Sequence, residues 1–304
     1  MPCSWWVFNA TGPRHRGRSA AHWFTVYASY DPNYKRTAIH AFQTMSSNAV
    51  PMLIAELESP PSRFAYVLNS WLNRVRSVPM DYNQQFNWRK ERACHLLREI
   101  GDPARAAIPA LAKASTNGMW YIATSAHAAL IKLRHEPLTP YFELLKDKSD
   151  ALKWYPTAML LGYCGTNASP AIPLLLKSLQ DSNTLIQAHA LTAIGMIECE
   201  PQACVPAVIP FLTNADVALR HKAYYALLAF KEHAQTASDQ IILGLTDADP
   251  WIRNQALLAC LEILPPADQR RALPQAEALL DDPNSFVRDS AKKLLPKIRA
   301  SAVK

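Results

Sequence analysis

The stretch QACVPAVIPFLTNADVALRHKAYYALLAFK, residues 202–231, contains the pattern that decides the fold. A short apolar segment with two prolines is followed by the turn residues Asn214 to Asp216 and then by a second segment. Asp216 stands where a side-chain oxygen caps the free N–H groups of a helix's first turn. One helical face of the second segment is apolar and carries Leu219, Ala223, Ala226, Leu227 and Phe230. The stretch is therefore predicted to be two helices joined by a short turn.

The same spacing about a central alanine recurs along the chain. A bulky apolar residue generally stands four positions before each alanine, and apolar residues stand three, four and seven positions after it. The central alanines are Ala38, Ala93, Ala126, Ala158, Ala190, Ala223, Ala256 and Ala291. After a first gap of 55 residues, their intervals are 33, 32, 32, 33, 33 and 35 residues. This period predicts a solenoid of stacked helical pairs, in which small central residues let neighbouring helices approach closely.

Short proline-containing segments precede several of these repeats, as in AAIPALAK (106–113), ASPAIPLLLKSL (168–179) and PAVIPFLT (206–213). With the recurring Asp, Val/Ile/Leu-Arg, Ala and Leu pattern, they make residues 19–299 resemble HEAT repeats. The segments NAVPMLIAELES (48–59) and RACHLLREIGDPARAAIPALA (92–112) also resemble uncharacterised bacterial HEAT-repeat proteins. The resemblance implies an all-α fold, a right-handed α-α superhelix (α-solenoid) of about eight HEAT-like helical pairs, and it implies no known activity.

Three segments fall outside the regular repeats. Residues 1–18 are expected to form a mobile basic N-terminal arm, and residues 300–304 a C-terminal tail. Residues 59–87 interrupt the second repeat and explain the first gap; an apolar stripe from Phe64 to Val75 predicts an inserted helix, followed by a loop over 77–87. Such an insertion either carries recognition or only covers apolar surface.

Charge is distributed unevenly along the chain. The net charge is +7, but residues 1–135 carry 16 Lys and Arg against 7 Asp and Glu, whereas residues 136–304 carry 16 against 18. The basic N-terminal half is compatible with nucleic acid, an anionic membrane surface or an acidic protein as partner, and equally with a solvated surface that has no specific partner. No apolar run is long enough to span a membrane and no secretory signal is recognised, so a cytoplasmic location is expected.

Acidic or amide residues four positions before a cation recur at the predicted turns. These pairs are Asp31 and Lys35, Asp216 and Arg220, Asp249 and Arg253, and Asn284 and Arg288. At this spacing both members lie on the same side of one helical turn. We interpret them as helix caps and contacts between repeats, in preference to a binding site.

Catalytic signatures are weak throughout the sequence. HEAT-like deoxyhypusine hydroxylases use several His-Glu pairs to hold iron, and this chain has one, His135-Glu136. HEAT-like DNA glycosylases combine a basic groove with aromatic residues and a catalytic Asp; Trp120, Trp154 and Trp251 are present, but no acidic residue stands out beside them. Nothing selects the bilin lyase activity of other HEAT-like proteins. No metal, cofactor or catalytic residue is therefore assigned.

Cysteine spacing points to no metal site either. The chain has six cysteines without a Cys-x-x-Cys pair, and Cys94, Cys164 and Cys260 fall in helical segments as small apolar residues. Cys199 and Cys204 share a loop, and their spacing does not decide whether they form a disulfide.

The remaining candidate surface lies on the second helix of each pair. Positions two before, two after and five after the central alanine point away from the packed face. The candidate binding residues there are Arg36, His40, His95, Arg98, Tyr163, Thr192, His221, Tyr225 and Asn254. The competing interpretation is that neighbouring repeats cover this strip, including Leu160, Leu258 and Leu261. We favour a non-catalytic scaffold that binds a protein or peptide on its inner helices; the alternative is a nucleic-acid-binding solenoid, glycosylase-like, that uses the basic half.

Overall fold

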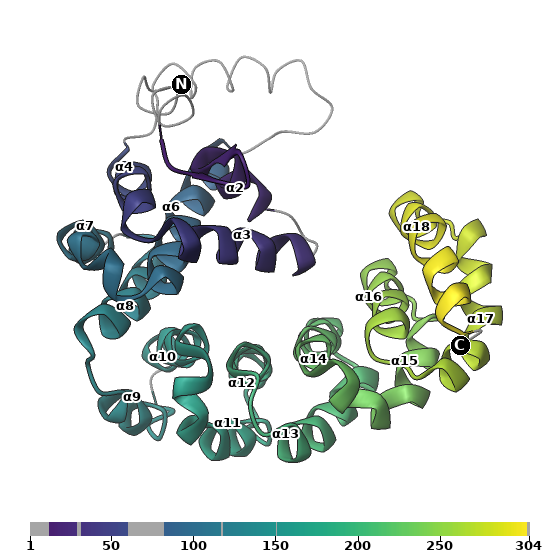
Figure 1. Cartoon of the computed structure of the whole chain (residues 1–304). Coiled ribbons are helices and arrows are strands. Elements are labelled where there is room, and N and C mark those ends of the chain that lie inside the picture. Colours follow the sequence, from purple (N-terminus) through teal and green to yellow (C-terminus); the bar gives the residue numbers. More distant parts are fainter. Residues whose placement is uncertain (1–11, 29–31, 60–81, 117, 150, 303–304) are drawn as a thin grey trace. The chain divides into compact units, whose positions relative to one another are not determined.

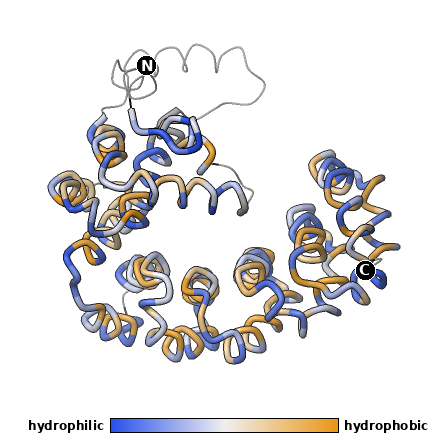
Figure 2. The backbone as a smooth tube through the Cα atoms, viewed as in Figure 1, coloured by the Kyte–Doolittle hydropathy of each residue, from blue (hydrophilic) through white to orange (hydrophobic). Residues whose placement is uncertain are grey.

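The computed structural model describes residues 12–28, 32–59, 82–116, 118–149 and 151–302. The predicted all-α solenoid of helical pairs is confirmed (Figure 1). The chain divides into two compact units, residues 1–137 and 138–304. Each unit has its own hydrophobic core. In Figure 2, hydrophobic and hydrophilic positions alternate along the helices, as amphipathic helices packed on one face require.

Unit 1 contains a two-stranded hairpin and three helical pairs among its described residues. Its elements are β1 (Arg14–His15), β2 (Arg18–Ser19), α2 (Ala20–Val26), α3 (Pro32–Met45), the 3-10 helix η1 (Ser46–Ala49), α4 (Val50–Glu58), α6 (Tyr82–Ile100), η2 (Asp102–Ala107), α7 (Ile108–Ala114) and α8 (Trp120–Arg134). The second helices of its last two pairs, α6 and α8, pack side by side, and α4 and α7 lie against them.

The described residues of unit 2, 138–149 and 151–302, form five helical pairs arranged in two layers. Its elements are α9 (Thr139–Leu144), α10 (Ala151–Cys164), η3 (Gly165–Ala171), α11 (Ile172–Ser178), α12 (Thr184–Ile197), α13 (Pro201–Val208), η4 (Ile209–Thr213), α14 (Val217–Phe230), η5 (Lys231–Ala237), α15 (Ser238–Gly244), α16 (Pro250–Glu262), α17 (Pro266–Ala278), η6 (Leu279–Asp281) and α18 (Ser285–Ala302). The even-numbered second helices α10 to α18 form one layer and the odd-numbered first helices the other (Figure 1).

The first helix of a pair is commonly a 3-10 turn that continues into a short α-helix. Pro109 and Pro173 lie at the first positions of α7 and α11, where a missing N–H costs nothing and the fixed φ of proline suits the helix. Within the 3-10 turns, small alanines such as Ala104 and Ala107 are fully buried. The proline-containing segments of the sequence therefore mark the junction of the two helix types.

All eight central alanines are fully buried, with no exposed surface. The residue four positions before the alanine is also buried in six repeats. These are Ile122, Trp154, Ile186, Leu219, Ile252 and Val287. The first repeat is an exception, because Tyr34 is 58% exposed although the spacing places it on the packed face. In the second repeat, Arg89 fills this position and is satisfied by buried Glu56, which accepts from its Nε at 2.9 Å.

Small residues allow the second helices of unit 2 to approach one another closely. A Cβ added at Gly195 of α12 would lie 2.7 Å from the Cα of Ala226 in α14. A Cβ added at Gly162 of α10 would lie 3.1 Å from the side chain of Met196. The α14 backbone occupies the space at Gly195, and the Met196 side chain occupies it at Gly162.

Three boundaries differ from the sequence prediction. Residues 12–18 do not form an independent arm, because β1 and β2 pair and Trp23 Nε1 donates to the His15 carbonyl oxygen at 3.2 Å. Helix α6 begins at Tyr82, so the expected loop over 77–87 ends earlier. Helix α18 continues into the expected tail to Ala302, which is buried and whose carbonyl oxygen accepts from Arg270. The predicted inserted helix from Phe64 to Val75 lies outside the described residues.

Candidate binding surface

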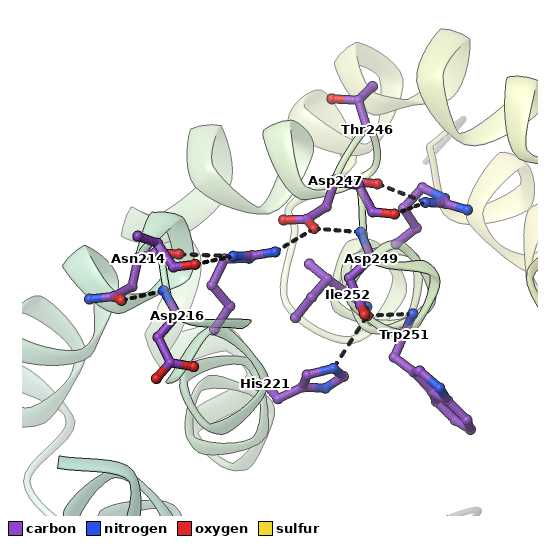
Figure 3. Close-up of polar contacts among 12 residues, drawn as sticks. Asn214, Asp216, His221, Thr246, Asp247, Asp249, Trp251 and Ile252 are labelled. Carbon is purple, nitrogen blue, oxygen red and sulfur yellow. Dashed lines mark hydrogen bonds and ion pairs between the residues drawn. The ribbon is translucent and has the colours of Figure 1, made fainter. Parts of the chain in front are cut away.

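A repeated turn precedes the second helix in four successive repeats of unit 2, and Figure 3 shows the two that begin at Asn214 and Asp247. Its first residue accepts a hydrogen bond from the backbone N–H two residues later, at 2.8 to 3.0 Å. These first residues are Asp181, Asn214, Asp247 and Asp282. The residue two positions later then caps the helix, as Asp216 does by accepting from the Ala218 N–H at 2.8 Å. The turn therefore sets where each second helix begins.

The side chain six positions after the first turn residue closes the same turn. Arg220 Nη1 donates to the Asn214 carbonyl oxygen at 2.9 Å, and Arg253 Nη1 donates to the Asp247 carbonyl oxygen at 2.7 Å. Arg288 does the same on Asp282. Because these bonds use backbone carbonyls, each arginine is held in a fixed orientation.

Two of these arginines also reach the next repeat. Arg220 Nη2 lies 2.8 Å from Asp247 Oδ1 (Figure 3). Arg253 binds Asp282 through two bonds of 2.7 and 2.8 Å, and the Asp282 side chain is only 3% exposed. Such paired, hydrogen-bonded ions hold adjacent repeats in register. Of the residues predicted to cap helices, Asp216, Asp249 and Asn284 do so. Asp31 lies outside the described residues, and Lys35 lies over the Tyr27 ring.

One junction in unit 2 is neutral on both sides. Gln187 occupies the arginine position of the fifth repeat and donates to the carbonyl oxygens of Leu179 and Asp181. The turn of the sixth repeat begins with Asn214 in place of an aspartate. Both members of the ion pair are thus replaced by neutral residues at this junction, so neither a guanidinium nor a carboxylate is left without its partner.

Much of the predicted strip is covered by packing. Tyr163 and Thr192 are 7% and 8% exposed, so the prediction that they point to solvent is wrong. The cause is the close approach of α10, α12 and α14, which lets neighbouring side chains cover the small residues between them. Leu160 is buried for the same reason, whereas Leu258 and Leu261 are half-buried.

The predicted residues of unit 1 have mixed surroundings. Arg36 and His40 are exposed on α3. His95 and Arg98 are half-buried on α6; His95 lies 3.7 Å from Glu91, and Arg98 donates to Glu99. Burial lowers the pKa of His95, so its imidazole is neutral at pH 7. These four residues therefore do not share one environment.

An accessible aromatic surface lies on the second helices of the last three repeats. We call it the aromatic face. It consists of His221, Tyr225, Trp251, Asn254 and Phe286, from α14, α16 and α18. Tyr225 is 46% exposed, and His221 Nε2 lies 3.3 Å from the capping carboxylate of Asp249 (Figure 3). His221, Tyr225 and Asn254 were predicted from their spacing.

Trp251 and Phe286 were missed as candidate binding residues. Each lies two residues after the residue that caps its helix, Asp249 in α16 and Asn284 in α18, and their rings contact each other with centroids 4.6 Å apart. They are nevertheless 55% and 42% exposed. The available signal was the aromatic residue five positions before the central alanine in two consecutive repeats.

A second ring contact joins α10 and α12. The Tyr155 and His189 rings lie 3.7 Å apart and tilted by 34°. Burial and the Lys222 ammonium of α14 lower the pKa of His189 to about 4, and burial raises the pKa of Tyr155 to about 12. Both rings are therefore uncharged near pH 7, which suits packing between helices.

The described residues offer little for metal or nucleophilic chemistry. No group of three or more His, Cys, Asp and Glu side chains is placed to hold a metal ion within them. His135 of the lone His-Glu pair ends α8 and lies 3.1 Å from Asp102. Trp154 is a core residue, 1% exposed, whose Nε1 donates to the Leu145 carbonyl oxygen. No helix in the described ranges is both long and apolar enough to cross a membrane.

The described cysteines are all free. Cys199 and Cys204 therefore form no disulfide, and the Cys204 thiol donates to the Cys199 carbonyl oxygen at 3.4 Å. Burial raises the pKa of Cys94, Cys204 and Cys260 to about 12. These three thiols stay protonated, and the thiolate is the form that attacks or ligates.

Comparison with solved structures places the chain among helical-repeat proteins. A mutant of Kap121p matches with a TM-score of 0.50 at 12% identity, over 93% of this chain and 33% of that one. A designed armadillo repeat protein in complex with the peptide (KR)4 matches with a TM-score of 0.48 at 17% identity, over 82% and 99%. A HEAT-like repeats protein from the archaeon Thermococcus onnurineus NA1 matches with a TM-score of 0.43 at 11% identity, over 74% and 100%.

Sequence comparison matches no protein-family model and no curated protein. At the identities of the structural matches, the likeness establishes the fold alone. The chain thus has a HEAT-like helical-repeat fold.

Proposed function

We propose that this chain is a scaffold that binds a segment of a protein partner on the aromatic face of unit 2. The observation that carries the proposal is the contact between Trp251 and Phe286, two large rings that remain about half exposed. Aromatic side chains dominate the binding energy of protein interfaces because each removes a large apolar area from water at a small entropic cost.

The surroundings of these rings support a fixed binding surface. Trp251 follows Asp249, whose carboxylate accepts the N–H groups of Trp251 and Ile252 at 2.9 and 3.1 Å. Arg253 is anchored in the same turn and in the next repeat. The backbone beneath the rings is therefore rigid, and a partner loses little free energy in ordering it.

The chemistry of the face indicates what its partner segment carries. The ring pair offers an apolar platform to an aliphatic or aromatic side chain. Tyr225, Asn254 and His221 offer a hydroxyl, an amide and an imidazole for hydrogen bonds to an extended backbone. We therefore expect a peptide segment with a bulky apolar anchor and no requirement for a high charge.

Affinity purification with matched variants tests this function. The full chain is compared with Trp251→Ala/Phe286→Ala and with Leu243→Ala, which truncates a residue of similar exposure, 60%, on the first-helix layer. Proteins retained by the wild type and by Leu243→Ala but lost from the double variant support the proposal. For a recovered partner, truncation of a binding aromatic is expected to weaken affinity by about 2 kcal/mol, or roughly 30-fold. Identical sets of proteins from all three baits overturn it.

A further inference from the structure

A second surface, far from the aromatic face in the sequence, is rich in cationic residues. The described residues 12–28 and 32–55 contain no Asp or Glu. They contain five cationic residues, which are Arg14, Arg16, Arg18, Lys35 and Arg36, and three histidines, which are His15, His22 and His40. All five cationic side chains belong to exposed residues. We call the hairpin and the start of α3 the basic surface.

The hairpin holds its arginines on a fixed backbone. Arg14 pairs with Ser19 and His15 with Arg18, and the turn residues Arg16 and Gly17 both have positive φ, at 48° and 74°. This two-residue turn matches the twist of the strands, but its first position usually carries Asn, Asp or Gly. An arginine there costs local strain. The sequence therefore accepts a conformational cost that places a guanidinium at the tip.

Contacts beneath the hairpin anchor it to unit 1. The Ala20 N–H donates to the Pro13 carbonyl oxygen at 3.0 Å. His15 points inward, with its ring centroid 5.7 Å from Trp23 and 5.7 Å from His40 of α3. The hairpin and α3 are thus adjacent. Because Arg14 pairs with Ser19 and Arg18 pairs with His15, Arg14 and Arg18 lie on opposite faces of the hairpin, with Arg16 at its tip.

Carboxylates elsewhere in unit 1 are largely occupied by other arginines. Glu56 is bound by Arg89, Glu99 by Arg98 and Glu136 by Arg134. The hydrogen bonds that pair them are 2.9, 2.8 and 3.3 Å long. These acids therefore already have cationic partners within unit 1.

The composition of the surface favours phosphate over other anions. Four of its five cations are arginines, whose planar fork binds phosphate oxygens in pairs. Tyr34 is its one exposed large apolar residue within the described stretches, so the surface lacks the apolar centre that a protein interface or membrane insertion needs. A phosphate backbone needs no such centre, since released counterions supply the affinity, and a single exposed ring is able to stack on a base.

We propose that the basic surface binds the phosphate backbone of a nucleic acid. Arg16 contacts a phosphate from the tip of the turn, Arg14 and Arg18 reach phosphates from the two faces of the hairpin, and Lys35 and Arg36 of α3 extend the contact. The contacts are to phosphate groups, so the binding is independent of base sequence. This surface is separate from the aromatic face, and either function stands without the other.

Fluorescence anisotropy with the full chain tests the proposal. The probes are a labelled 20-nucleotide oligo-dT and a 20-base-pair DNA duplex, titrated between 50 and 200 mM NaCl. The test variant is Arg14→Gln/Arg16→Gln/Arg18→Gln, and the charge-matched control is Lys113→Gln/Lys132→Gln/Arg134→Gln, which removes three positive charges from α7 and α8. Arg16→Gln alone covers the case in which the triple variant misfolds, because Arg16 lies at the tip of the turn.

We expect the wild type to bind at least one probe at 50 mM NaCl with an affinity that falls steeply with salt. The triple variant is expected to lose at least tenfold in affinity and to reduce the slope of log K against log salt by about 2 to 3, since each phosphate contact contributes about 0.7 to 0.9. The control is expected to lose less than threefold. Absence of wild-type binding to both probes overturns the proposal, as does an equal loss in the control. If poly-glutamate displaces the labelled probe as strongly as unlabelled oligo-dT does at equal charge, the surface binds acidic proteins equally well, and the proposal is overturned too.

Discussion

Replacing Asp282 by asparagine tests how the repeats of unit 2 are held together. The substitution keeps an oxygen that accepts from the Asn284 N–H, which Asp282 binds at 2.8 Å, but it removes the charge that pairs with Arg253. The Arg253 side chain is 12% exposed, so its guanidinium is left with little water to replace the carboxylate. Losing one partner of a largely buried, doubly bonded pair costs about 3 to 5 kcal/mol; the retained amide oxygen reduces this to about 2 to 4 kcal/mol.

The chain supplies its own control for this experiment. Gln187 and Asn214 form the equivalent neutral junction between the fifth and sixth repeats. The double variant Arg253→Gln/Asp282→Asn copies that junction and leaves no lone charge. We therefore expect its loss of stability to be smaller than the sum of the two single losses by about 1.5 to 3 kcal/mol, within the range of residues in direct contact.

Urea unfolding followed by circular dichroism, with all four proteins at pH 7, measures this coupling. The same ion pair also affects how the free energy of unfolding depends on pH under acidic conditions. The hydrogen bonds from Arg253 lower the pKa of Asp282, so the stabilisation is present above the unfolded carboxyl pKa near 3.8 and is lost as pH falls through the lower folded value. The reasoning is refuted if the free energies of unfolding of the single variants lie within 0.5 kcal/mol of the wild-type value. It is also refuted if the loss in the double variant equals the sum of the two single losses.

Three further predictions concern packing and protonation. Gly195→Ala places a Cβ 2.7 Å from the α14 backbone and is expected to destabilise by about 1 to 3 kcal/mol, whereas Gly118→Ala, with open space, stays near wild type in the same urea assay. Ala223→Trp is expected to force the helices of the sixth pair apart and to lower the free energy of unfolding by a similar amount. Tyr225→Ala is expected to leave the melting temperature nearly unchanged. If both variants lose the same stability, the assignment of Ala223 to the packed face and Tyr225 to the accessible face is refuted. Because the pKa of His189 is lowered from 6.5 to about 4, the unfolded chain binds more protons in this window. Stability is therefore expected to fall from pH 6.5 to pH 4, and His189→Gln to remove about 1 to 2 kcal/mol of that fall after allowance for partial exposure; unchanged pH profiles contradict it.

The buried core of the repeats was predictable because the same residue type, alanine, occupies the same close contact between helices in every repeat. A central alanine such as Ala223 is needed wherever two helices meet closely, so its spacing records the packing directly. The turn residues were equally readable, since caps such as Asp216 act within their own helix. Tyr34 is the exception, because it stands at the same spacing in the first repeat and is nevertheless exposed.

The accessible surface was harder to predict because exposure depends on neighbouring repeats. Tyr163 and Thr192 have the same helical phase as Tyr225, or nearly so, yet the close approach of adjacent second helices buries them. Trp251 and Phe286 were passed over because they stand five positions before the central alanine, outside the three positions from which the strip was predicted. Only the distance between their rings and their exposure distinguish them.

Photo-crosslinking tests most directly whether the second-helix layer of unit 2 is the recognition surface. Phe286 is replaced by p-benzoylphenylalanine in one protein and Leu243 of α15 in another, and both are irradiated in extracts of cells that express the chain. The account predicts a discrete protein adduct from position 286 that disappears when Trp251→Ala is added, and no such adduct from position 243. Equal adducts from both positions, or an adduct from position 243 alone, would contradict it.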